Sequence, residues 1–184
     1  ALHTEGDRLK FINCRILGNQ DTIYTGAKFT RLYFKDCYID GTTDFIFGPS
    51  TALFENCMIH SKRNSYVTAA STPKEAKYGY IFKHCKLTAE PGVDKVYLGR
   101  PWRPYAYTLF IECELGKHIV LAGWHNWGKQ SNEETARYME YKNTGEGANA
   151  SERVAWSKQL TKKEAEAVTV DAIFRTQSNW NPID

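Results

Sequence analysis

Aromatic, cysteine and aliphatic residues recur along the chain in one fixed frame, Phe-x-x-Cys-x-(Ile/Leu). The Cys and the aliphatic residue are two positions apart, which is the alternation of a β-strand with one buried face. Successive cysteines are 23, 20, 28 and 28 positions apart, and a frame with such a period indicates stacked structural repeats. The frame occurs five times, at Phe11 to Ile16, Phe34 to Ile39, Phe54 to Ile59, Phe82 to Leu87 and Phe110 to Leu115.

Turn-forming residues separate the frames, and no amphipathic helix lies between consecutive frames. This pattern disfavours a doubly wound α/β sheet, and the Leu/Asn signature of leucine-rich repeats is missing too. The pattern predicts an all-β fold, a right-handed parallel β-helix, in which each repeat forms one coil and the Cys and apolar side chains stack in interior ladders. We expect a single domain over residues 1–184, which is enough chain for a sizeable core.

The last part of the chain, residues 158–184, has a different pattern. Thr161 is followed three residues later by Glu164, which is a capping box at the start of an Ala-containing segment. We therefore expect a tail with a short helix that packs outside the coil, and we interpret its Lys–Glu pairs as a solvated face.

The five cysteines allow two interpretations. Neighbouring coils lie about 4.8 Å apart, a spacing that does not exclude disulfides between coils. The count is odd, however, and stacked side chains point in parallel, which favours reduced and inert thiols that fill the core. No C-x-x-C occurs and no His lies at zinc-ligand spacing, so the sequence predicts no metal site.

Two aspartates occupy the same offset from consecutive frame cysteines. Asp21 lies seven residues after Cys14, and Asp44 lies seven residues after Cys37. If the cysteines stack, the two carboxylates lie on adjacent coils about one strand spacing apart, where like charges are costly. The alternative is that both are exposed turn residues, since Asp is common in turns. Against it, Phe-Ile-Phe follows Asp44, and Gln20, an amide donor, precedes Asp21.

A close pair of carboxylates has a chemical use, because mutual repulsion raises one pKa and keeps one group protonated while the other is ionised. Such a pair can supply a nucleophile and a general acid to one site. Arg100, in "YLGRPW", is the leading candidate for holding the ionised partner, and Trp102 lies beside it. The alternatives are an ordinary surface arginine and a tryptophan that packs in the core.

Charge and hydropathy narrow the function classes. The net charge is +3 with no dense Lys/Arg run, so nucleic acid is not an expected partner. No apolar stretch reaches the length of a membrane span. The hydrophobic content of 42% is typical of a globular protein.

Six segments, taken in order, resemble the signature segments of the pectinesterase family, the pectin methylesterases among the carbohydrate esterases. They are "GNQDTIY", "GTTDFIFG", "YLGRPW", "AGWHNWG" (122–128), "YMEYKNTGEGA" (138–148) and "RVAW" (153–156). The resemblance runs from about Gly6 to Trp180, and it implies a right-handed parallel β-helix, which the repeats predict independently.

The resemblance also implies roles for the matching residues. Asp44 corresponds to the nucleophile, Asp21 to the general acid/base and Gln20 to an oxyanion-hole donor. Arg100 corresponds to the arginine that hydrogen-bonds the nucleophile. The aromatic residues that the resemblance assigns to the substrate cleft are Trp102, Phe47, Tyr24 and Trp124. Such a row suits a polysaccharide, because the apolar faces of sugars can pack on aromatic rings.

The implied reaction is the hydrolysis of galacturonate methyl esters of homogalacturonan to methanol and demethylated pectin, with no cofactor and no metal. Pectin lies outside the cell, so the resemblance implies a secreted, periplasmic or extracellular location. No G-x-S-x-G occurs and no motif pairs a His with a Ser, which disfavours a serine esterase. Three alternatives stay open: a β-helix that only binds polysaccharide, a pectin lyase or polygalacturonase, and a relative that acts on other esters.

Members of the family carry a second oxyanion Gln just upstream of the position that corresponds to Ala1, where this sequence begins. We therefore expect the native protein to include the preceding coils, as an upstream segment or as a separate chain that packs on this one. On that expectation residues 1–184 alone lack one donor, a loss that can cost on the order of 10²–10³ in rate.

Overall fold

The computed structural model describes residues 1–175 and 179–183, and in these residues the chain winds through three parallel sheets. Sheet A contains β1 (Leu2–Thr4), β4 (Ile23–Thr25), β7 (Ile46–Gly48), β10 (Tyr66–Ala70) and β13 (Tyr97–Gly99). Sheet B contains β2 (Leu9–Ile12), β5 (Arg31–Lys35), β8 (Thr51–Glu55), β11 (Tyr80–Lys83), β14 (Tyr107–Ile111), β16 (Arg137–Tyr141) and β17 (Lys158–Gln159). Sheet C contains β3 (Arg15–Ile16), β6 (Tyr38–Gly41), β9 (Met58–Ser61), β12 (Lys86–Ala89) and β15 (Glu114–Leu115). The helices are α1 (Ser131–Thr135), α2 (Lys162–Glu166), α3 (Val170–Phe174) and the 3₁₀ turn η1 (Glu146–Ala148).

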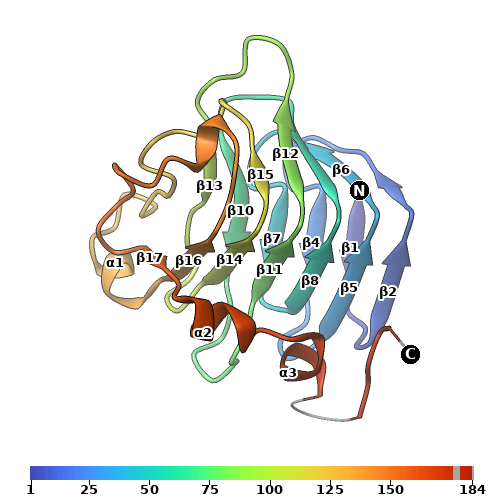
Figure 1. Cartoon of the computed structure of the whole chain (residues 1–184). Coiled ribbons are helices and arrows are strands. Elements are labelled where there is room, and N and C mark those ends of the chain that lie inside the picture. Colours follow the sequence, from blue (N-terminus) through green and yellow to red (C-terminus); the bar gives the residue numbers. More distant parts are fainter. Residues whose placement is uncertain (176–178, 184) are drawn as a thin grey trace.

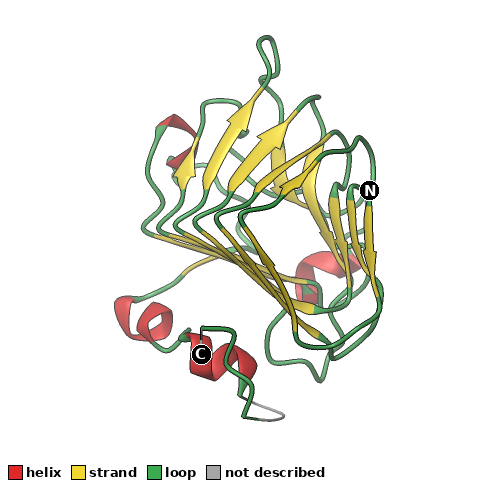
Figure 2. Ribbon diagram, turned by 90° about the vertical axis from the view of Figure 1, so that its right-hand side faces the viewer, coloured by secondary structure: helices red, strands yellow, loops and turns green. Residues whose placement is uncertain are grey.

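Each repeat of the sequence makes one turn of a coil. The chain passes through sheet B, then sheet C, then sheet A, and returns to sheet B one level further along (Figures 1 and 2). Every paired strand is parallel to its neighbour, with β5 beside β8 and β8 beside β11, for example. The predicted fold class, an all-β parallel β-helix with a short helical tail outside the coil, is confirmed. None of the described helices is long and apolar enough to cross a membrane.

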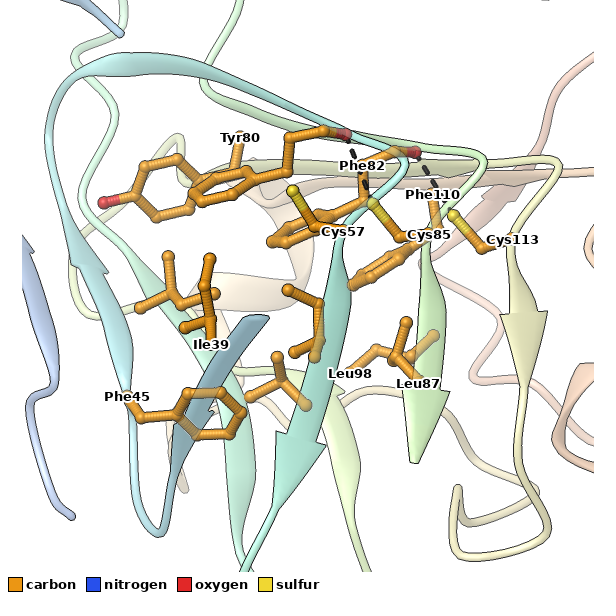
Figure 3. Close-up of a cluster of buried hydrophobic side chains, with 14 of the residues drawn as sticks. Ile39, Phe45, Cys57, Tyr80, Phe82, Cys85, Leu87, Leu98, Phe110 and Cys113 are labelled. Atoms are coloured by element: carbon orange, nitrogen blue, oxygen red, sulfur yellow. Dashed lines mark hydrogen bonds between the residues drawn. The ribbon is translucent and has the colours of Figure 1, made fainter. Parts of the chain in front are cut away.

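The Phe residues of the frame form a stacked ladder inside the coil. Phe11 pairs with Phe34 in register, Phe34 with Phe54, and Phe54 with Phe82. The centroids of successive rings lie 4.5–4.7 Å apart, which is close to the spacing of strands in a sheet. Phe82 and Phe110 continue the ladder, and Figure 3 shows their rings side by side. The frame found in the sequence therefore sets the register of the whole solenoid.

The frame cysteines form a second ladder beside these rings (Figure 3). Each thiol from the second coil onward donates to the carbonyl oxygen of the Phe one coil earlier, at 3.3–3.6 Å. All five cysteines are free, as the reduced-thiol interpretation predicts. Burial raises the pKa of the Cys85 thiol well above its ordinary value, which keeps it in the unreactive protonated form.

The C-terminal tail contains two short helices, where the sequence pattern predicts one. The capping box at the start of α2 is present: the Thr161 N–H donates to Glu164 Oε2 at 2.8 Å, and Thr161 Oγ1 accepts from the Glu164 N–H. A second cap, in which Thr169 Oγ1 accepts from the Ala172 N–H, starts α3. Phe174 of α3 is fully buried in a cluster on the outer side of sheet B, so the tail covers that sheet (Figure 1).

Candidate active site

The two aspartates singled out by the sequence lie on neighbouring coils, in the turns that lead into strands β4 and β7 of sheet A. Each precedes its strand by two residues, and β4 and β7 pair in register through Tyr24 and Phe47. The Asp21 N–H donates to the Thr43 carbonyl oxygen at 3.1 Å, which ties the two turns together. Asp21 and Asp44 both adopt the left-handed conformation, with φ of 57° and 50°. This conformation is one that Asp tolerates better than most residues, and it ends the regular alternation just before the strand.

Both carboxylates open into one cleft of about 260 Å³. Its wall is formed by Gln20, Asp21, Asp44, Phe47, Ala69, Arg100, Trp102 and Trp127. Four of the predicted catalytic residues are therefore brought together, although they come from positions up to 80 residues apart in the sequence. The alternative, that the two aspartates are unrelated turn residues, is wrong, because both line the same cleft.

Asp44 is the buried member of the pair, with only 6% of its surface exposed. Arg100 donates to both of its oxygens: Nε lies 2.9 Å from Oδ1 and Nη2 lies 2.7 Å from Oδ2. This two-point contact matches the planar fork of a guanidinium to a carboxylate, and it stabilises the ionised form of Asp44. Arg100 is thus a partner of the carboxylate, and not an ordinary surface arginine.

Two aromatic rings that the sequence analysis missed hold the Arg100 guanidinium between them. Its central carbon lies 3.9 Å from the centroid of Tyr66 and 3.8 Å from the centroid of Trp127. The backbone N–H of Trp127 donates to His125 Nδ1 at 3.0 Å, and the His125 ring packs on Tyr66. The segment "AGWHNWG" carried the signal for Trp127, whereas nothing in the frame pointed to Tyr66.

Asp21 has the opposite electrostatic environment. Its side chain is exposed on the cleft wall, and its pKa is raised, first by desolvation there and then by the negative charge of Asp44. No hydrogen bond links its carboxylate to a donor in the described part of the chain. One site therefore holds an arginine-paired carboxylate beside a carboxyl group whose pKa is raised.

Gln20 is exposed on the cleft wall next to Asp21. Among the described residues no acceptor engages its side-chain amide, so both amide hydrogens are available to a bound group. An unengaged donor at the mouth of a carboxylate pair is the arrangement that an oxyanion hole needs.

The aromatic residues predicted for the cleft divide into two groups. Tyr24 and Phe47 stack with ring centroids 4.6 Å apart on the outer face of sheet A, and Trp102 meets them edge-on at 6.5 and 5.8 Å. The His3 ring continues this row on the far side of Tyr24, at 4.7 Å. Tyr24, Phe47 and Trp102 are half-buried and form an aromatic row beside the carboxylates.

Trp124 is a correction to the sequence analysis, because it lies in the core with 1% of its surface exposed. Trp124 forms an isolated parallel β-bridge with Gly99, and Gly99 pairs with Thr68, which pairs with the buried Ile46. Trp124 therefore continues the inward-facing column of Ile46. Its ring stacks on Tyr138 at 4.3 Å, and its Nε1 donates to the buried Glu140 at 3.3 Å. The cleft position that the sequence analysis assigned to Trp124 is filled by Trp127, three residues later.

The loop that carries Trp127 is held by α1, a helix that the sequence analysis did not predict. Asn132 Nδ2 donates to the Asn126 carbonyl oxygen at 3.0 Å, and Asn126 Nδ2 donates to Glu133 Oε1 at 2.7 Å. These contacts come from residues on both sides of the loop, so they position the ring that covers the arginine.

Comparisons with known proteins show the family to which the chain is similar. A family model described as Pectinesterase matches residues 1–177. "Pectinesterase 31" of Arabidopsis thaliana is 43% identical over 166 residues, which are 90% of this chain and 52% of that protein. The chain spans about half the length of this relative and of putative pectinesterase 11 of Arabidopsis thaliana, and about a third of the length of several other curated relatives.

Two solved structures have the same architecture. Pectin methylesterase from carrot superposes with a TM-score of 0.85 at 33% identity, over 91% of this chain and 57% of that one. A pectin methylesterase in complex with a hexasaccharide superposes with a TM-score of 0.81 at 31% identity, over 96% of this chain and 59% of that one.

Proposed function

Because the chain belongs to the pectinesterase family, we propose that it carries the reacting carboxylates of an esterase that acts on methylated homogalacturonan. The products are methanol and demethylated pectin. The observation that supports this most directly is the two-point contact of Arg100 with Asp44, next to an Asp21 whose pKa is raised. Since pectin is an extracellular polymer, the proposal includes export of the protein.

The first step forms an acyl-enzyme. An oxygen of the Asp44 carboxylate attacks the carbonyl carbon of the methyl ester, and the carbonyl oxygen becomes an oxyanion that accepts a hydrogen bond from the Gln20 amide. The bond from that carbon to the methoxy oxygen then breaks. The protonated form of Asp21, which is more populated than in an ordinary Asp because its pKa is raised, gives its proton to the methoxy oxygen, and methanol leaves.

The second step releases the product. Asp21, now ionised, takes a proton from water, and the hydroxide oxygen attacks the anhydride that joins Asp44 to the sugar. The bond between Asp44 and the sugar acyl carbon breaks, which restores the Asp44 carboxylate and leaves a galacturonic acid unit. Asp21 holds its proton again, so the net reaction is ester plus water to acid plus methanol.

The site supplies the electrostatics that this sequence of steps needs. Arg100 orients the Asp44 carboxylate through two hydrogen bonds, and the Tyr66 and Trp127 rings pack against the guanidinium. The half-buried aromatic row beside the carboxylates offers flat apolar surfaces to a sugar chain. The oligosaccharide bound to the solved relative supports a polymeric substrate for this chain as well.

The test is methanol release from highly methylated pectin by the full-length protein and by its Asp44→Ala and Asp21→Ala variants. We expect each variant to lose at least about a thousandfold in kcat, because both groups act in the same reaction. The matched control is Asp36→Ala, an exposed aspartate on the same coil as Asp44 with a similar left-handed φ of 53°.

The expected pattern is full loss in the two site variants and near-parent rates in the control, with all three variants folded at the assay temperature. If the parent binds pectin but releases no methanol, the chain belongs to a binding protein and the catalytic proposal is wrong.

A further inference from the structure

Trp127, whose ring packs on the Arg100 guanidinium, has a backbone conformation that large residues rarely adopt. Its φ is 63°, in the left-handed region, where the Cβ atom crowds the neighbouring carbonyl oxygen. A large side chain keeps such a conformation only where surrounding contacts hold it. The position of the ring over Arg100 therefore depends on what fixes the Trp127 backbone.

The His125 side chain provides that contact. The Trp127 N–H donates to His125 Nδ1 at 3.0 Å, and among the described residues this is the one hydrogen bond that the Trp127 backbone makes. His125 is itself fixed to sheet A, because its own N–H donates to the Gly99 carbonyl oxygen at 3.1 Å. Its ring packs between Tyr66 and Tyr97, with centroid distances of 5.4 Å to each. The imidazole thus connects sheet A to Trp127.

The direction of this hydrogen bond fixes the protonation state of His125. A backbone N–H can only donate, so Nδ1 must carry a lone pair, and the ring is the neutral imidazole with its proton on Nε2. A protonated ring carries an N–H on both nitrogens and has no acceptor left. Protonation of His125 therefore removes the bond that holds the Trp127 backbone.

The environment of the imidazole opposes its protonation. The groups that the structure shows against it are Arg100, from the segment after β13, and the phenol rings of Tyr66 and Tyr97. The negative charge of Asp44 is paired with Arg100. The pKa of His125 is lowered, first by desolvation and then by the Arg100 charge. The hydrogen bond to Trp127 therefore persists below the ordinary histidine pKa of about 6.5 and is lost at a more acidic pH.

We propose that His125 is a positioning residue for the esterase reaction: its neutral imidazole holds the Trp127 ring against Arg100, and its protonation releases that ring. This inference rests on the proposed esterase function. The contact bears on the reaction because Arg100 orients the Asp44 carboxylate through two hydrogen bonds, and the Trp127 ring covers one face of that guanidinium at 3.8 Å. Without the ring Arg100 gains freedom to turn, so the reaction slows as the pH falls through the pKa of His125.

The same loop shows which substitution keeps the bond and removes the titration. One residue further on, Asn126 Oδ1 accepts from the Gly128 N–H at 2.8 Å, which is the same contact between a side chain and the backbone two positions later. His125→Asn can make this contact to Trp127 with its side-chain oxygen, and it carries no titratable proton. His125→Phe keeps an aromatic ring but has no acceptor.

The experiment measures kcat/KM for methanol release from methylated pectin against pH, with the full-length protein and its variants. For the parent we expect a loss of about tenfold as the pH falls through the pKa of His125. His125→Asn should stay within about threefold of the parent at pH 8 and lack this step. His125→Phe should be about tenfold slower than the parent at pH 8 and lack the step too. The matched control is His84→Asn, an exposed histidine between β11 and β12, which should keep the parent's profile.

A second measurement reports the ring position without any substrate. In NMR spectra of the full-length protein, a nuclear Overhauser contact between the Trp127 ring and the Arg100 side chain should be present at pH 8, and its assignment is checked by its loss in Trp127→Phe. In the parent this contact should disappear at the pH of the kcat/KM step. In His125→Asn it should persist below that pH, which a purely structural role of His125 does not predict.

Failures of the two proposals are distinguishable. If His125→Asn keeps the acid step of the parent, or if His125→Phe equals the parent at pH 8, the positioning role is wrong and the esterase function stands. A slow His125→Asn in which the contact between Trp127 and Arg100 is intact also overturns it, because the reaction then needs something other than this bond. If the parent releases no methanol at any pH, the proposed function is wrong, and the positioning role falls with it.

Discussion

At the scale of single residues, the geometry of Arg100 decides how Asp44 is presented. Two hydrogen bonds fix the carboxylate in the plane of the guanidinium, and the rings of Tyr66 and Trp127 close on both faces of that plane. An arginine held in this way loses its freedom to rotate. A lysine at this position would offer a point charge with neither the fork nor the stacking.

The raised pKa of Asp21 has a consequence for stability. Burial and the Asp44 charge make the native state hold the Asp21 proton more tightly than the unfolded state does. This contribution is fully present below the ordinary Asp pKa and is lost as the pH rises through the raised value. At neutral pH the ionised Asp21 therefore costs stability, and Asp21→Asn should raise the Tm at pH 7.

The measurement is Tm against pH for the parent and Asp21→Asn, with Asp36→Asn as the control. We expect the difference between Asp21→Asn and the parent to shrink toward zero as the pH falls to about 3, where the Asp21 carboxyl is protonated. A Tm difference that does not depend on pH, or a lower Tm for Asp21→Asn at pH 7, would contradict the electrostatic account of this pair.

At the scale of elements, the Phe and Cys ladders set the register, and the register brings Asp21 level with Asp44. This is why the fold and the carboxylate pair could be predicted from the sequence: the frame is local and repeats in every coil. The inward orientation of Trp124 could not be predicted in this way. It depends on one isolated β-bridge to Gly99, which lies outside the repeated frame. Tyr66 was missed for the same reason, since its role depends on an arginine contributed by the next coil.

The Phe ladder predicts a large energetic contrast between two phenylalanines. Phe54 is fully buried between Phe34 and Phe82, with ring centroids 4.6 Å away on each side, while 43% of Phe29 is exposed. Phe54→Ala should lower the free energy of unfolding by about 3–5 kcal/mol. Phe29→Ala, the matched control, should cost less than about 1 kcal/mol.

Urea denaturation of both variants measures this contrast, provided that the slope m stays equal to that of the parent. Equal losses in Phe54→Ala and Phe29→Ala would mean that the ladder does not carry the stability of the coil.

At the scale of the whole molecule, the C-terminal tail and the candidate active site lie on different sheets. The tail helices pack on the outer side of sheet B, where Phe174 is buried and the Arg31 guanidinium donates to its carbonyl oxygen at 2.7 Å. The carboxylate cleft lies on sheet A. The described tail helices do not cover that sheet (Figures 1 and 2). A stack of coils with a continuous core can thus carry a costly pair of like charges at its surface.

The central claim is that Asp44 and Asp21 act together in one reaction, and a double-mutant comparison tests it most directly. The measurement is kcat for methanol release from methylated pectin by the full-length protein and its Asp44→Asn, Asp21→Asn and doubly substituted variants. We predict losses of at least about a thousandfold in each single variant, and no further loss in the double variant beyond the more damaged single one. Losses that multiply in the double variant, or an Asp44→Asn variant that keeps the parent's rate, would contradict the claim.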